Sequence, residues 1–170
     1  MTATISRNKI SNWETSHIPN LIGKTALITG ANSGLGYFTA KALAEKNAHV
    51  IIACRSLEKA NQTIKKLKAL NPVGIFTPLE LDLSDLKNVV EVQSKIFDNF
   101  ENLDLLINNA GIMHPPRTLS AQGYEIQFAV NHLAHMLLTL KFLPIIEKKE
   151  ESRIVTVSYT HLRAHETIQH

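Results

Sequence analysis

Short, almost entirely apolar runs alternate with longer stretches that carry helical periodicity, and this alternation restricts the fold more than any other feature of the sequence. The runs lie at residues 25–29, 49–53, 75–82, 103–108 and 153–157. Nearly continuous apolar strands are typical of parallel sheets that are covered on both faces. Strands and helices that alternate in this way predict a doubly wound α/β fold with three layers, in which helices cover both faces of a parallel sheet.

The stretches between the apolar runs predict four helices, at residues 34–46, 56–70, 85–100 and 122–148. Ser56 and Ser84 are good N-cap residues for the second and third of these helices. The first helix is predicted to pack on the sheet through a stripe at helical spacing, which consists of Leu35, Phe38, Thr39, Ala42 and Leu43.

The length of 170 residues fits one domain with a sizeable core. We predict an N-terminal arm at residues 1–20, pinned by Trp13 and Ile18, followed by the domain at residues 21–158. Residues 159–170 are polar, rich in histidine and without core periodicity, so we predict that this tail does not belong to the fold.

Composition argues against several classes of function. The 18 Lys and Arg residues exceed the 15 Asp and Glu residues only slightly, and they form no basic stripe, which disfavours nucleic-acid binding. Cys54 is the only cysteine, so no internal disulfide forms, and its side chain is predicted to be a small buried hydrophobe. The best apolar run, residues 136–146, is interrupted by Lys141 and Pro144, and the first twenty residues lack the apolar core of a signal peptide. We therefore expect a soluble cytoplasmic protein without a membrane span.

The first apolar run leads directly into a glycine-rich segment, TGANSGLG at residues 29–36, which opens the first helix. Gly30 would permit the tight turn, Gly34 the approach of a pyrophosphate, and Gly36 the close packing of helix and sheet. The amide groups of the helix N-terminus would bind the phosphates. An ordinary tight turn is the alternative, but the position at the start of a βαβ unit favours a dinucleotide. The predicted contacts are Gly30, Asn32, Ser33, Gly34, Leu35 and Gly36.

The glycine spacing, TGxxxGxG, resembles that of the short-chain dehydrogenase/reductase family, and further signatures of this family follow in order. They are LD at residues 81–82, NNAG at 108–111 and QFAVNHLAHMLLT at 127–139. The strings GKTALITGANSGLG, ACR and NNAGIM are most similar to the branch of retinol dehydrogenases and protochlorophyllide reductases. The resemblance covers nearly everything from Leu21 to Ser158. It implies a Rossmann-like fold and hydride transfer between a nicotinamide cofactor and a carbonyl or alcohol.

The end of the second apolar run indicates which nicotinamide cofactor binds. An acidic residue there would bind the ribose 2′-hydroxyl of NAD, whereas this chain has IIACRS with Arg55. A guanidinium can bind the additional phosphate of NADP(H), so we predict NADP(H), with a solvated charge at the strand end as the alternative.

The resemblance adds further cofactor contacts. It implies that Asp82 binds the adenine amino group, that Leu83 packs nearby, and that the backbone of Asn109, Ala110 and Gly111 lines the nicotinamide ribose. The alternatives are a helix cap for Asp82 and a sharp turn for residues 109–111.

The resemblance also implies a catalytic set, of which only one member is matched here. Family members use a tyrosine with a lysine four residues later, a serine, and an asparagine in the central helix that positions a water. Asn131 matches the asparagine, or else it is a helix residue that bonds a neighbouring carbonyl. Ser158 stands one position before that of the catalytic serine.

Two tyrosines in the sequence are followed four residues later by a basic residue and so resemble the missing tyrosine–lysine pair. Tyr37 and Lys41 have the right spacing but lie in the predicted cofactor helix, so we interpret them as a coincidence. Tyr159 and Arg163 would need a helix directly after a strand, without the loop that the family places there. The chain is therefore predicted to be an inactive fragment.

His165 and His170 in the tail do not have the spacing of a zinc site, because they would point away from each other on a helix. His161 and His165 do have a suitable spacing, but no third ligand is evident, and we predict no metal site.

Three hypotheses follow. We favour an NADP(H)-dependent reductase with a small, hydrophobic substrate, present here as a fragment whose sheet is incomplete at its C-terminal edge. The others are a non-catalytic nucleotide-binding module and an interaction scaffold. We also expect association or aggregation through the exposed edge strand at residues 153–157.

Overall fold

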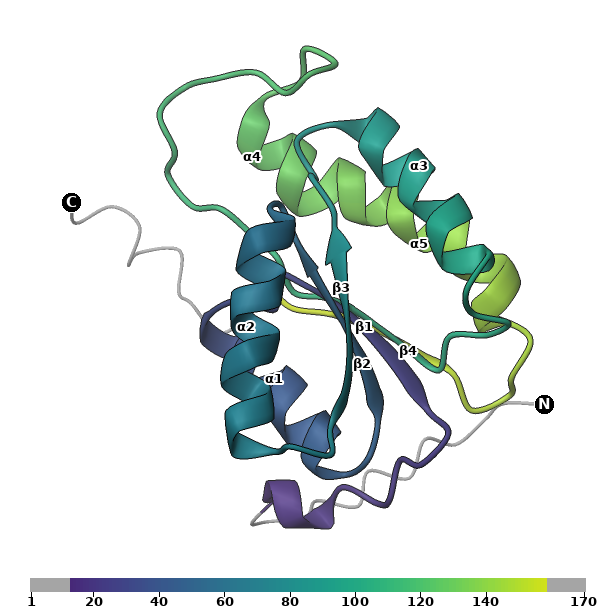
Figure 1. Cartoon of the computed structure of the whole chain (residues 1–170). Helices are drawn as coiled ribbons and strands as arrows, with labels where there is room; N and C mark the ends of the chain where they lie inside the picture. Colours follow the sequence, from purple (N-terminus) through teal and green to yellow (C-terminus); the bar gives the residue numbers. More distant parts are fainter. Residues whose placement is uncertain (1–12, 159–170) are drawn as a thin grey trace.

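Parallel pairing joins all five strands of the sheet, in the order β3-β2-β1-β4-β5 (Figure 1). The computed structural model describes residues 13–158. This arrangement confirms the predicted α/β fold, and β1 has the predicted limits, while each of the other four strands differs from its predicted limits by one or two residues at one end. The strands are β1 (Thr25–Thr29), β2 (His49–Cys54), β3 (Ile75–Glu80), β4 (Leu105–Asn108) and β5 (Arg153–Thr156).

Helices cover both faces of the sheet, with α1 and α2 on one side and α3 and α5 on the other (Figure 1). A short 3-10 helix, η1, precedes the sheet. The long helix of the sequence prediction is observed as three consecutive segments, α4, η2 and α5, of which η2 is a π-helical turn. The helices are η1 (Thr15–His17), α1 (Gly34–Glu45), α2 (Leu57–Leu70), α3 (Leu86–Phe97), α4 (Ile126–Phe128), η2 (Ala129–Leu133) and α5 (Ala134–Ile146).

Helix starts follow side-chain capping, and one predicted cap is wrong. The Ser56 hydroxyl accepts a hydrogen bond from the Lys59 amide at 3.4 Å, which confirms it as the N-cap of α2. The N-cap of α3 is Asp85 rather than Ser84, because the Asp85 carboxylate accepts from the Lys87 amide at 2.9 Å.

The long helical stretch begins later than predicted, at Ile126. Gly123 has a φ of +81°, a left-handed conformation that ends any helix running through it. The Glu125 carboxylate then caps the new helix by accepting hydrogen bonds from the amides of Gln127 and Phe128. The turn chemistry of this segment therefore outweighs its helical periodicity.

The stripe predicted for α1 is wrong in part. Leu35 and Phe38 are 66% and 64% exposed, whereas the residues that face the sheet are Ala40, Leu43 and Ala44. Small side chains such as Ala40 and Ala44 on the buried face let the helix lie close to the strands, and Leu35 and Phe38 point outward.

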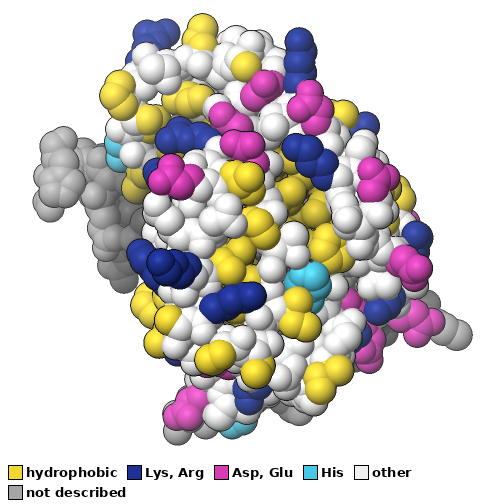
Figure 2. Space-filling view, in the orientation of Figure 1, with side chains coloured by type: hydrophobic (Ala, Val, Ile, Leu, Met, Phe, Trp, Pro, Cys, Tyr) yellow, Lys and Arg dark blue, Asp and Glu magenta, His cyan; other side chains and the backbone are white. Residues whose placement is uncertain are grey.

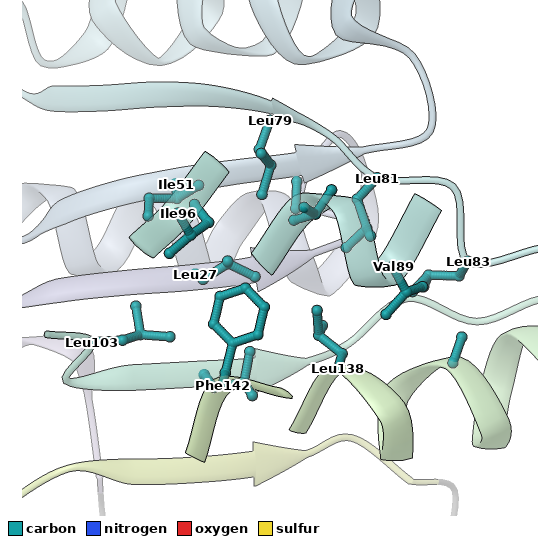
Figure 3. Packing of buried hydrophobic residues seen from close by; sticks show 14 of the residues in the cluster. Leu27, Ile51, Leu79, Leu81, Leu83, Val89, Ile96, Leu103, Leu138 and Phe142 are labelled. Carbon is teal, nitrogen blue, oxygen red and sulfur yellow. The ribbon is translucent and has the colours of Figure 1, made fainter. Parts of the chain in front are cut away.

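Two apolar clusters, one on each face of the sheet, form the core. On the face covered by α3 and α5, Phe142 lies fully buried between Leu27 and Leu138 (Figure 3). Its ring meets the ring of Phe97 edge to face, with 6.0 Å between the centroids. Each side chain of this size stabilises the fold by about 1.5–3 kcal/mol when it is fully buried.

The stretch from Ile126 to Ile146 is, by length and composition alone, long and apolar enough to cross a membrane. This contradicts our expectation that Lys141 and Pro144 would rule out such a segment. Of its most apolar window, 44% is buried in the fold, and the buried face packs on α3 and the sheet. This packing explains why the buried part of the stretch is apolar, and the absence of a membrane span stays a prediction.

The N-terminal arm is joined to the body by polar contacts and not by its tryptophan. Trp13 is 58% exposed, so the prediction that it pins the arm is wrong. Instead, the Lys46 ammonium donates to the Ser16 carbonyl at 3.1 Å, and the Asn47 amide donates to Asn20 Oδ1 at 3.0 Å. Residues 1–12 of the arm and the tail at 159–170 lie outside the described residues.

The two edges of the sheet differ. At one edge, Pro78 lies within β3 and lacks the N–H that another strand would need. Ile75 of the same strand is 58% exposed. Hydrophobic side chains gather in the middle of the face that β3 crosses (Figure 2, in the orientation of Figure 1). At the other edge, β5 exposes Ile154 and Val155 by 39% and 46%. Association through β5 stays a prediction.

At the opposite end of the strands from the glycine-rich loop, the buried Asp104 links β1 and β4. Its Oδ2 accepts from the Thr25 amide at 2.8 Å, and its Oδ1 lies 3.1 Å from Lys24 Nζ and 3.6 Å from Lys149 Nζ. The hydrogen bond to Asp104 and the charge of this carboxylate raise the pKa of Lys24.

We expect D104A to lower the free energy of unfolding by about 2 kcal/mol, because it removes a buried, charge-assisted hydrogen bond to Thr25. K24M should cost much less, since the Lys24 ammonium remains accessible to water. Urea unfolding followed by circular dichroism measures both values. Equal losses in the two variants would show that the ion pair, and not the bond to Thr25, carries the effect.

Candidate functional site

The order of the strands creates a crevice at the carboxyl ends of β1 and β4. The chain runs outward from β1 to β2 and β3 and then returns to β4 on the other side of β1. Ligands of open α/β sheets bind at such a switch point. A cavity of about 620 Å³ lies here, within the range of about 300–1,000 Å³ that small-molecule sites occupy.

Most of the residues predicted to bind the cofactor converge on this cavity. Three predicted site residues, Gly34, Gly36 and Asn131, do not line it, and the contribution of each is described below. Whether the lining residues contact a cofactor stays a prediction. The lining includes Gly30, Asn32, Ser33, Leu35, Arg55, Asp82, Leu83, Asn109, Ala110 and Gly111.

Gly30 and Gly36 allow the loop after β1 to lie directly against the loop after β4. Gly30 has a φ of +65°, and a Cβ at this position would lie 2.9 Å from Ala110 Cα. A Cβ on Gly36 would lie 2.5 Å from both Asn109 Nδ2 and the Gly30 carbonyl oxygen. The turn predicted at Gly30 is confirmed, while Gly36 is needed for contact with these two loops rather than with the sheet itself.

The start of α1 leaves backbone amides free for an anion. Gly34 has a φ of +53°, and a Cβ there would meet no atom within 4 Å. The Ser33 side chain does not cap the helix, and among the described residues the amides of Gly34, Leu35 and Gly36 have no acceptor. Uncapped amides at a helix N-terminus, beside an open cavity, suit a phosphate group.

The Thr29 hydroxyl joins the ends of β1 and β4. Thr29 Oγ1 accepts hydrogen bonds from the backbone amides of Asn109 and Ala110, both at 2.9 Å. The Asn109 side-chain amide donates to the Thr29 carbonyl, also at 2.9 Å. These three bonds hold the NNAG loop in position. The sequence prediction did not include Thr29, although its place at the end of β1 is a usable signal.

Two basic side chains face the cavity at the end of β2. Arg55 was predicted, and Lys59, four residues later in the first turn of α2, was missed. Both are exposed, and neither forms an ion pair within the described part of the chain. Their spacing of four residues was the signal that could have identified Lys59.

Asp82 is not the helix cap that was its alternative role, because the N-cap of α3 is Asp85, and the contact of Asp82 with adenine stays a prediction. Its Oδ1 accepts hydrogen bonds from the Ser84 amide at 2.8 Å and the Ser84 hydroxyl at 2.6 Å, so it orders the turn before α3. Within residues 13–158, its Oδ2 makes no hydrogen bond and is free to accept one. Leu83, which is 6% exposed, packs into the core beside it.

Asn131 lies in the π-helical turn and is bound to the loop after β4. Its Oδ1 accepts from the Ile112 amide at 2.9 Å, and its Nδ2 donates to the Ile112 carbonyl at 2.8 Å. The side chain is thus already occupied, by a carbonyl of the loop rather than of its own helix. A π-helical turn of this kind is frequent at functional sites.

Apolar residues from three separate segments, the loop after β4, the helical stretch that begins at Ile126 and the end of β5, close the remainder of the cavity. No local pattern marks them, because only the tertiary structure brings them together: Ile112, Ile126, Val130 and Val157.

Tyr37 and Lys41, the tyrosine–lysine pair in α1, do not form an active site. Lys41 Nζ lies 2.9 Å from Glu45 Oε1, and Tyr37 packs against the core cluster beneath α1 and α2. This geometry confirms the interpretation of Tyr37 and Lys41 as a coincidence. The pair Tyr159 and Arg163, and the histidines of the tail, lie outside the described residues.

The site, with its glycine cradle at the switch point of a parallel sheet, defines a nicotinamide-dinucleotide type of domain, and comparison with known proteins identifies its family. The family model described as short chain dehydrogenase matches residues 24–165, so the chain belongs to this family. The match extends beyond Ser158, where we predicted that family agreement ends, and so does not support that boundary.

Named relatives agree with the predicted branch. Retinol dehydrogenase 13 of Homo sapiens is 40% identical over 144 residues, which cover 84% of this chain and 44% of the relative. The chain spans about half the length of the curated relatives it matches.

Solved structures share the fold. The Pseudomonas aeruginosa RhlG/NADP complex has a TM-score of 0.69 and 26% identity, and the match covers 81% of this chain and 55% of that one. An oxidoreductase from Haemophilus influenza with bound NAD has a TM-score of 0.67 and 26% identity, covering 82% and 56%. Neighbours of the same fold thus hold either nicotinamide cofactor.

We expect G36A to destabilise the chain by about 1–3 kcal/mol, because its methyl group would overlap backbone and amide atoms of two loops that cannot both withdraw. G111A is the matched control, since a Cβ there would lie 3.5 Å from Asn131 Oδ1, an ordinary contact. Denaturant unfolding measures both variants. A G36A chain as stable as the wild type would contradict the close approach of these loops.

The Cys54 thiol lines the cavity but is 3% exposed, and burial raises its pKa to about 11 from 9.0. Only the thiolate reacts with a disulfide reagent, so labelling of the native chain at pH 8 should be about 100-fold slower than in denaturant. Cys54 is the only cysteine, so its labelling with dithionitrobenzoate is unambiguous. Equal rates in the native and denatured chains would contradict the burial of this thiol.

Proposed function

We propose that this chain forms the cofactor-binding part of an NADP(H)-dependent oxidoreductase. In such a protein the bound nicotinamide supplies or accepts a hydride, and the substrate is the carbonyl or alcohol that exchanges it. The residues described above would hold the cofactor: the free amides of α1 its diphosphate, Asp82 Oδ2 its adenine, and the NNAG loop its nicotinamide ribose.

The preference for NADP(H) over NAD(H) is supported by the charges at the end of β2. Arg55 and Lys59 both line the cavity, whereas Glu58, the first carboxylate after β2, does not line it. A 2′-phosphate placed between them would be stabilised by a guanidinium and an ammonium. This pair of cations is the observation that carries the proposal.

A hydrophobic substrate is supported by the apolar side of the cavity. Ile112, Ile126, Val130 and Val157 all line the cavity, and Val157 follows β5, which β1 and β4 separate from β2 and Arg55. The curated relatives named as retinol dehydrogenases would act on an apolar alcohol of this kind.

A non-catalytic nucleotide-binding module is the second candidate. Tyr37 is the only tyrosine in the sequence that a lysine follows four residues later, and that pair lies in α1. NADPH binding without turnover of any aldehyde would favour this module or an inactive fragment, and absence of NADPH binding would favour a scaffold. We expect the first of these results for the 170-residue chain.

We expect R55A and K59A each to weaken NADPH binding about tenfold, because each removes a charge-assisted contact to the 2′-phosphate at an exposed site. NADH binding should change less than about twofold, since NADH has no such phosphate. Fluorescence titration of the wild-type chain and the two variants with each nucleotide measures the six dissociation constants.

The matched control is K66A, which removes an exposed lysine of the same helix that does not line the cavity. It should leave both affinities unchanged. If R55A and K59A weakened NADH as much as NADPH, the cations would act on the whole nucleotide and the preference for NADP(H) would be refuted.

A further inference from the structure

His135 is a buried polar residue that the proposed function does not use. It lies in α5, is 5% exposed, and faces the end of β1. Its Nε2 is 2.9 Å from Thr29 Oγ1, and its Nδ1 is 3.3 Å from the carbonyl oxygen of Asn131. The imidazole therefore bridges the threonine that holds the NNAG loop and the π-helical turn that carries Asn131.

The neighbours of His135 determine which of its nitrogens carries the proton. A hydroxyl has one proton and two lone pairs, and both lone pairs of Thr29 Oγ1 are used by the amides of Asn109 and Ala110. The hydroxyl must therefore donate to a third group. His135 Nε2 at 2.9 Å is a better acceptor position than the Ile107 carbonyl at 3.4 Å.

It follows that Nε2 is unprotonated and that Nδ1 carries the proton, which it donates to the Asn131 carbonyl. Burial lowers the pKa of His135, which favours this neutral form. A protonated imidazole would direct a second donor at a hydroxyl that has no lone pair left.

We propose that His135 is a positioning residue: as a neutral Nδ1–H imidazole it orients the Thr29 hydroxyl so that this group can hold the Asn109 and Ala110 amides. The proposal deepens the proposed function, on which it rests for the identity of the ligand. Without the imidazole, the Thr29 hydroxyl would donate its proton to the Ile107 carbonyl instead. This rotation would turn one lone pair of Oγ1 away from the amide that it accepts from, so one of the two hydrogen bonds to the NNAG loop would weaken.

Small displacements of the NNAG loop would change the cavity, because no free space separates this loop from the glycine-rich loop. Ala110 Cα lies 2.9 Å from the position that a Cβ on Gly30 would occupy, so the NNAG loop and the glycine-rich loop already touch. Loss of one amide contact to Thr29 would therefore change the width of the cavity between these loops.

The first test measures NADPH affinity of the 170-residue chain in a double-mutant cycle. H135L and T29V should each weaken binding about three- to tenfold, the value of one neutral hydrogen bond. The double variant should be no weaker than T29V alone, because His135 acts through the Thr29 hydroxyl. H135Q should restore affinity to within about twofold, since its amide offers both an acceptor and a donor. H132Q, an exposed histidine of the same helical stretch, is the control.

Additive losses in the double variant, or an H135Q chain as weak as H135L, would overturn the proposal and reduce His135 to a packing residue. Circular dichroism of each variant confirms that the fold is retained. If H135L does not fold, the NADPH affinities of H135Q, T29V and the wild type still test the proposal. Only a positioning role predicts near-normal NADPH binding for H135Q.

The second test needs no cofactor. The ¹⁵N chemical shifts of the His135 ring in the wild-type chain should show the Nδ1–H tautomer, and T29V should change the Nε2 shift. An Nε2–H tautomer would refute the proposal directly. A wild-type chain that shows the expected tautomer but binds no NADPH would refute the proposed function and leave the orientation of Thr29 by His135 standing.

Discussion

The contact between the loops that follow β1 and β4 is the constraint on which the remainder of the site depends. It consists of three hydrogen bonds between Thr29 and the NNAG loop, together with two glycines whose Cβ positions are already occupied by neighbouring atoms. Because these loops belong to adjacent strands, their separation sets the mouth of the crevice. The amides of α1 and the backbone of the NNAG loop therefore face a single cavity.

The sheet and its two clusters supply the rigidity that this contact needs. Fully buried residues of β1 and β2 point alternately to the two faces, so Leu27 and Ile51 join Phe142, while Ile28 and Ile52 join the cluster beneath α1 and α2. A close-packed interior transmits displacement instead of absorbing it. Loops that extend from such strands are held within the small tolerance that a cofactor site requires.

Polar groups are distributed unequally between the two ends of the sheet. At the amino ends of the strands, the buried Asp104 accepts a hydrogen bond from the Thr25 amide and forms ion pairs with Lys24 and Lys149. At the carboxyl ends, the amides of α1 and the cations of Arg55 and Lys59 lack partners among residues 13–158. Charged groups at the amino ends are therefore paired within the protein, whereas those of Arg55 and Lys59 at the carboxyl ends have no ion-pair partner in the described part of the chain.

The sequence alone determined the fold class, the glycine cradle, and the resemblance to the family, because β–α alternation and glycine spacing are local patterns with few compatible structures. It did not reveal Thr29, Lys59 or His135 as parts of the site, and it misplaced the start of the long helix and the exposed face of α1. Those features depend on which residues meet across the sheet, on turn geometry at Gly123, and on how closely α1 can approach its strands. Distances between segments far apart in the chain exist only after folding, so the tertiary structure decided them.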